Sequence, residues 1–104
     1  IHNNKYYFLC KSIIEELLKK NINYLNLRNL LYEICIYEIE FENCIYYIIK
    51  YLINNNYLCK NNVSNIILYI IEFLKLYNNN YRQIYHLEKF LFNIKIVINN
   101  GLLS

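Results

Sequence analysis

Apolar residues recur at intervals of three and four along almost the whole chain, and the alternation typical of strands is rare. The sequence has no proline and one glycine, so clusters of asparagine are the main breaks between helical segments. Abundant isoleucine favours strands locally, but the period and the lack of Gly/Pro turns argue against them. The pattern predicts an all-α fold, a five-helix bundle, with helices over about 5–20, 24–37, 40–53, 62–77 and 81–98.

Four of these segments carry an apolar stripe on one helical face, with polar residues elsewhere. Such stripes are the positions that an amphipathic helix turns toward a core. The predicted core positions are Tyr6, Leu9, Cys10, Ile13, Ile14, Leu17 and Leu18; Leu27, Leu30, Leu31, Ile34 and Cys35; Phe41, Cys44, Ile45, Ile48, Ile49 and Leu52; and Ile84, Leu87, Leu91, Ile94 and Ile98, flanked by Phe90 and Val97.

The segment 62–77 differs because it is apolar nearly all round. Only Ser64, Asn65, Glu72 and Lys75 interrupt it between Val63 and Leu76. A helix that is apolar on every side is normally buried, so this segment is predicted to lie at the centre of the bundle. The alternative is that one of its faces is a partner surface.

Helix ends are predicted from charge and turn chemistry. Glu40 and Glu42 favour a helix N-terminus at the start of the third segment, because free N–H groups there carry partial positive charge. The asparagines in 54–56 suit a turn, since asparagine tolerates left-handed backbone. Asn99, Asn100 and Gly101 form a C-terminal cap of the expected type.

The length of 104 residues suits one domain, here 1–104, and is too short for two. The chain starts at Ile1 and contains no methionine, which we interpret as a piece of a longer or processed protein. Alanine, aspartate and threonine are also absent, while Asn, Ile, Leu and Tyr dominate; this composition is typical of an AT-rich genome. It raises apparent hydrophobicity without a structural demand.

The net charge of +3 is uneven: +3 over 1–32, −4 over 33–42 and +4 over 43–104. No dense basic run appears, so solvated helix faces are the simpler interpretation and a nucleic-acid patch the alternative.

The longest uncharged interior run, Asn61 to Ile71, has 11 residues. A spanning helix needs about 20, so no membrane segment and no signal peptide are predicted.

The cysteines at 10, 35, 44 and 59 include no C-x-x-C pair for zinc or redox exchange. Each lies among apolar residues, which predicts reduced, buried thiols and a reducing compartment. The single glycine excludes a Gly-rich phosphate loop. We therefore predict no cofactor, metal or catalytic residue. A small helical thiol enzyme pairing a cysteine with His86 remains an alternative, which cysteine labelling would test.

Large side chains with polar tips gather at the start of the fifth segment. Tyrosine and arginine are typical anchors of subunit contacts, although an ordinary amphipathic surface has the same appearance. The candidate interface residues are Tyr81, Arg82, Tyr85, His86, Lys89 and Phe92.

Two stretches carry a family resemblance. Ile84-Tyr85-His86-Leu87-Glu88, followed by Phe90, resembles the last collar helix in the subunit 3 branch of the replication factor C family, the small subunits of the eukaryotic sliding-clamp loader. Leu27-Arg28-Asn29-Leu30-Leu31-Tyr32-Glu33-Ile34 is similar to the arginine-rich helix of the same domain. The family's prolines before its third collar helix are replaced here by Tyr37-Glu38-Ile39-Glu40.

The resemblance implies a C-terminal collar domain that packs beside other clamp-loader subunits in a pentamer during DNA replication and repair. It implies a nuclear location, an ATPase module upstream of Ile1, and contact with the sliding clamp and primed DNA only through the parent complex. No enzyme activity is expected of this fragment itself. The alternative is a helical adaptor or apoptosis-regulator-like bundle that binds a partner helix in a groove.

Overall fold

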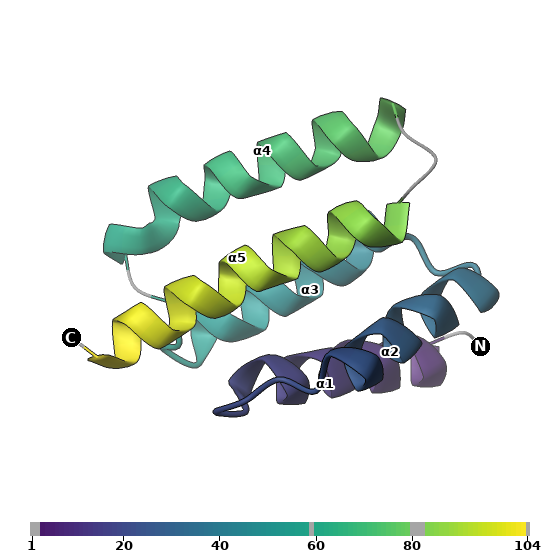
Figure 1. Ribbon diagram of the computed structural model, residues 1–104, viewed down its shortest axis with the longest axis horizontal. Helices are drawn as coiled ribbons and strands as arrows, with labels where there is room; N and C mark the ends of the chain where they lie inside the picture. Colours follow the sequence, from purple (N-terminus) through teal and green to yellow (C-terminus); the bar gives the residue numbers. More distant parts are fainter. Residues whose placement is uncertain (1–2, 59, 80–82, 104) are drawn as a thin grey trace. The chain divides into compact units, whose positions relative to one another are not determined.

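The computed structural model describes residues 3–58, 60–79 and 83–103, and over these ranges the fold is all-α, with five α-helices and no strand (Figure 1). This confirms the predicted fold class. The elements are α1 (Asn3–Leu18), α2 (Tyr24–Ile36), α3 (Phe41–Asn54), a short 3-10 helix η1 (Lys60–Asn62), α4 (Val63–Asn79) and α5 (Gln83–Leu103).

The helices form two compact units, Ile1–Asn54 and Asn55–Ser104. In the first unit α1 packs against both α2 and α3, and in the second α4 packs against α5. Figure 1 shows α4 and α5 running side by side. That the whole of 1–104 behaves as a single domain stays a prediction.

The interior of the first unit follows the apolar stripes closely. All six predicted core positions of α3 are buried, and so are Leu27, Leu31 and Ile34 of α2. On α1 the buried stripe keeps a spacing of three and four residues because side chains that far apart lie on the same helix face. Its members are Leu9, Cys10, Ile13, Ile14 and Leu17.

Local chemistry fixes the two connections of the first unit. Asn23 caps α2, because its side chain accepts a hydrogen bond from the Asn26 N–H at 3.1 Å. After α2, Glu38 adopts a left-handed backbone with φ of 57°. The N–H of Ile39 then donates to the Ile34 carbonyl, and that of Glu38 to the Cys35 carbonyl, which is the Schellman pattern of helix termination.

The predicted helix ends are mostly close to the observed ones, with one error. Asn56 has a φ of 65°, so an asparagine of the cluster does supply the left-handed turn. The predicted cap at Asn99, Asn100 and Gly101 is wrong, because α5 continues through these residues to Leu103. Gly101 does not have the positive φ that a glycine cap requires.

The prediction that α4 is buried on every side is also wrong. Ile66 and Phe73 are buried, and Phe73 packs on Phe90 of α5 with ring centroids 5.5 Å apart. The opposite face carries Ile67, Leu68 and Ile71, which are 49%, 62% and 57% exposed. The helix is therefore buried on one side only, and its outer face is apolar.

No helix among the described residues is long and apolar enough to cross a membrane.

Candidate functional site

The predicted interface on α5 divides between surface and interior. Tyr85 is 61% exposed and Lys89 is exposed, while Phe92 is half-buried. Residues four and seven positions after Tyr85 lie near it on a helix, so these three share one face. His86 is only 9% exposed and belongs to the interior. Tyr81 and Arg82 lie outside the described residues.

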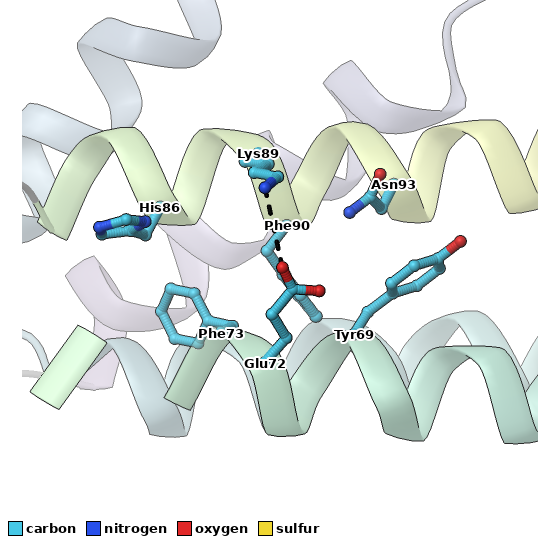
Figure 2. Close-up of a pocket in the computed structure, with 7 residues that line it drawn as sticks. All are labelled: Tyr69, Glu72, Phe73, His86, Lys89, Phe90 and Asn93. Carbon is cyan, nitrogen blue, oxygen red and sulfur yellow. Dashed lines mark ion pairs between the residues drawn. The ribbon is translucent and has the colours of Figure 1, made fainter. Parts of the chain in front are cut away.

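His86 lines a small pocket together with residues of α4 and α5 (Figure 2). The cavity volume is about 10 Å³, close to the space of one water molecule. Within the described part of the chain, neither ring nitrogen of His86 has a hydrogen-bond partner. The lining residues are Tyr69, Glu72, Phe73, His86, Lys89, Phe90 and Asn93.

An ion pair connects the two helices at the mouth of this cavity. The Lys89 Nζ lies 3.7 Å from the Glu72 Oε1, as the dashed line in Figure 2 shows. Both side chains are more than half exposed, so the pair contributes at most about 1 kcal/mol to stability. Lys89 is thus already engaged within the second unit, which lessens its value as a partner contact.

The outer face of α4 is exposed, as the alternative prediction of a partner surface requires. Ile67 and Leu68 lie four and three residues before Ile71, the two spacings that make each of them a neighbour of Ile71 on the helix surface. Ser64 and Lys75, one turn away at each end, are exposed and polar. An apolar centre with polar flanks is the composition of a protein interface. We call Ile67, Leu68 and Ile71 the α4 apolar row.

The first unit brings together two cysteines that spacing alone did not connect. The Sγ atoms of Cys10 on α1 and Cys44 on α3 lie 3.1 Å apart and share a buried hydrogen bond. Cys35 is exposed, contrary to the prediction that it is buried. Cys59 lies outside the described residues. The prediction of buried thiols therefore holds for Cys10 and Cys44 only.

The shared hydrogen bond makes the two thiols unequal. Hydrogen bonding with the Cys44 thiol lowers the pKa of Cys10, and burial opposes the lowering. Hydrogen bonding with Cys10, together with burial, raises the pKa of Cys44. Burial, and then the nearby sulfurs, raise the pKa of Tyr6 as well. Cys10 is therefore the thiol of the pair that ionises first.

In the part of the chain that the structure describes, no three His, Cys, Asp or Glu side chains converge to form a metal site. Comparison of the chain with protein-family models, with curated proteins and with solved structures found no match.

Proposed function

We propose that the chain is an assembly domain, which binds a helix of a neighbouring subunit along the α4 apolar row. The observation that carries this proposal is the exposure of Ile67, Leu68 and Ile71 on a helix whose other face packs on α5. Covering apolar surface is the main driving force of subunit association, at roughly 25 cal/mol per Å² removed from water.

The form of assembly that we propose is the collar of a clamp-loader small subunit of the replication factor C type. Its support is the resemblance of Leu27–Ile34 and Ile84–Phe92 to two collar helices, together with the all-α fold. In this proposal the domain holds a subunit in its pentamer in the nucleus, and the ATPase work belongs to an upstream module. The domain itself supplies buried area and fixed geometry, with no bond-making.

Tyr85 and Phe92 of α5 provide the second proposed contact. Tyr85 is exposed and Phe92 half-buried, so both can lose further surface to a partner. In a ring each subunit needs two different faces, one for each neighbour. The α4 apolar row and the Tyr85 face supply two such surfaces from the second unit.

The test is co-expression of the tagged chain with the other small subunits of replication factor C, followed by purification and mass measurement of the complex. We expect the wild-type chain to retain its neighbours, and Leu68→Glu and Ile71→Glu to reduce retention by about tenfold or more, because a buried unpaired charge opposes association. The matched control is Leu25→Glu, which makes the same change at a leucine on α2 that is 66% exposed.

Two outcomes would contradict the proposal at different levels. Equal retention of Leu68→Glu and wild type would exclude the α4 apolar row as the contact. Failure of the wild-type chain to retain any clamp-loader subunit would exclude the collar assignment and leave the adaptor alternative, in which the same row binds a partner helix. A synthetic amphipathic helix that binds wild type but not Leu68→Glu would then support that alternative.

A further inference from the structure

The sulfur pair of the first unit is poised for covalent linkage. Cys10 and Cys44 are 34 positions apart in the sequence, yet their Sγ atoms are separated by only 3.1 Å. A disulfide bond is about 2.05 Å long, so the two sulfurs need to approach by about 1 Å. We infer that Cys10 and Cys44 form a peroxide-sensitive pair, which closes to an intramolecular disulfide that ties α1 to α3.

The pair already has the division of roles that this chemistry needs. A nucleophilic thiolate and a nearby resolving thiol are the two parts of a redox-sensitive cysteine site. Cys10 supplies the thiolate because the Cys44 hydrogen bond lowers its pKa despite burial. Cys44 keeps its proton, since the same hydrogen bond and burial raise its pKa. The thiol that attacks second thus lies in contact with the one that is oxidised first.

Each step of the reaction is balanced with hydrogen peroxide as the oxidant. The Cys10 thiolate attacks one peroxide oxygen, the O–O bond breaks, and the departing hydroxide takes a proton to become water. Cys10 is then a sulfenic acid, two electrons more oxidised. The Cys44 sulfur attacks the Cys10 sulfur, the S–O bond breaks, and the second water leaves with the Cys44 proton. Two thiols and one peroxide give one disulfide and two waters.

Tyr6 lies beside the sulfur pair and also borders the open surface. Its hydroxyl donates a hydrogen bond to the Asn43 carbonyl at 2.7 Å, and the charges of both sulfurs act on it, which places it beside them. Tyr6 also lines two open surface hollows, of about 490 and 430 Å³. Both hollows have room for hydrogen peroxide. Displacement of the half-buried Tyr6 ring would therefore connect the solvent with the pair.

Cys35 is a poorer candidate than Cys10 for oxidation by peroxide. Cys35 is exposed on α2, and burial of part of its thiol raises its pKa, so less thiolate is present. Selectivity of oxidation for Cys10 over Cys35, despite the greater exposure of Cys35, is thus a specific consequence of the inference. This selectivity distinguishes a reactive Cys10–Cys44 pair from general oxidation of every accessible thiol.

The experiment treats the full chain with a few-fold molar excess of hydrogen peroxide, blocks the remaining thiols, and digests it under non-reducing conditions. Cleavage after Lys, Arg and Glu places Cys10 in Tyr6–Lys11 and Cys44 in Asn43–Lys50, each without another cysteine. We expect these two peptides to appear joined, with a mass two hydrogens below their sum, and to separate after dithiothreitol. Because a cross-link of this span restricts the unfolded chain, Tm should rise by about 10 °C and return on reduction.

Matched variants make the result decisive. Cys10→Ala and Cys44→Ala should lose both the joined peptide and the reversible rise in Tm, whereas Cys35→Ser should keep both. Tyr6→Ala should form the linkage several-fold faster than wild type, because the ring no longer covers the sulfurs. Oxidation of wild type that yields a Cys10 sulfinic acid without linkage, or a linkage through Cys35 or Cys59 in its place, would overturn the inference, and that result needs no variant to fold.

Discussion

The carboxylate of Glu16 shows how one buried charge can organise a connection between helices. Glu16 is 5% exposed, and its Oε2 accepts a hydrogen bond from the Lys19 Nζ at 2.9 Å. Its Oε1 accepts another from the Asn23 N–H at 2.9 Å, just before α2 begins. Burial alone would raise the pKa of Glu16, but the hydrogen bonds from Lys19 and Asn23 and the charge of Lys19 outweigh it, so the pKa is lowered.

We expect Glu16→Gln to reduce the free energy of unfolding at pH 7 by about 1 kcal/mol, since the amide keeps one acceptor and loses the charge. A lowered folded-state pKa stabilises the fold fully above the ordinary glutamate pKa of about 4.3. That contribution disappears as the pH falls through the lower folded-state pKa. The gap between wild type and Glu16→Gln should therefore narrow between about pH 4.5 and pH 2.

Urea unfolding of both proteins across this pH range measures the gap. Glu15→Gln is the control, because Glu15 is exposed beside Glu16 and its loss should change stability by less than about 0.5 kcal/mol. A gap that stays constant down to pH 2 would show that the carboxylate charge of Glu16 contributes nothing.

The sequence predicted the environment of single residues better than their partners. The apolar stripes placed Cys10 and Cys44 correctly in the interior. Their direct contact could not be predicted, because it depends on how α1 and α3 are aligned against each other. His86 was assigned to the surface, although its spacing of four and eleven residues from Phe90 and Val97 puts it on their buried face. That spacing was the available signal.

At the scale of elements, the end of α2 carries a local cost that the sequence does not reveal. A non-glycine residue in the left-handed region is disfavoured by roughly 1 kcal/mol, and Glu38 occupies that region with φ of 57°. The Schellman hydrogen bonds of Glu38 and Ile39 hold it there.

Glu38→Gly should accordingly raise the free energy of unfolding by about 0.5 to 1 kcal/mol, because glycine adopts a positive φ without a steric penalty. Thermal unfolding followed by circular dichroism measures the effect. Glu42→Gly, within the first turn of α3, is the opposite control and should destabilise by about 1 kcal/mol. Destabilisation by both substitutions would contradict the left-handed conformation of Glu38.

The one-sided packing of α4 gives a second test at this scale, from two adjacent isoleucines. Ile66 is 2% exposed and Ile67 is 49% exposed. Ile66→Ala should cost about 2 to 4 kcal/mol through lost burial and a cavity, whereas Ile67→Ala should cost less than about 1 kcal/mol. Chemical denaturation of the two variants distinguishes the faces, and equal large losses would restore the original expectation of a central helix.

The error about α4 has a physical origin. In a protein of ordinary composition, a helix that is apolar on every side is usually buried. This chain has no alanine, threonine or aspartate, so Ile, Leu and Tyr also occupy positions that face solvent. The period of the pattern survived this bias and predicted the five helices. The hydrophobic content of each segment was distorted by this bias, and so it predicted burial poorly.

At the scale of the whole molecule, the distribution of charge bears on whether the chain binds DNA directly. Tight binding requires several cations that neutralise neighbouring phosphates. The net charge is only +3, and Glu38, Glu40 and Glu42 are all exposed within one short acidic stretch. The sequence contains no dense run of basic residues.

We therefore expect the isolated chain to bind primed DNA with a Kd weaker than about 1 μM even at low salt, and to lose that binding near physiological salt. Fluorescence anisotropy with a labelled primed template measures both. A sub-micromolar Kd at low salt would show that the domain contributes a DNA contact of its own and that the proposed role in assembly is incomplete.

The ring cluster of the first unit has a practical consequence for the study of folding. Tyr6, Tyr7 and Tyr47 lie with ring centroids 5.2 to 6.0 Å apart, and the chain contains no tryptophan. Phenol rings held edge-to-face in an asymmetric environment give the near-ultraviolet dichroism that vanishes when side-chain packing is lost. This band reports chiefly on the N-terminal half, whereas the far-ultraviolet signal sums the backbone of both. Coincident or separate midpoints in the two wavelength regions would reveal whether the halves melt as one cooperative body.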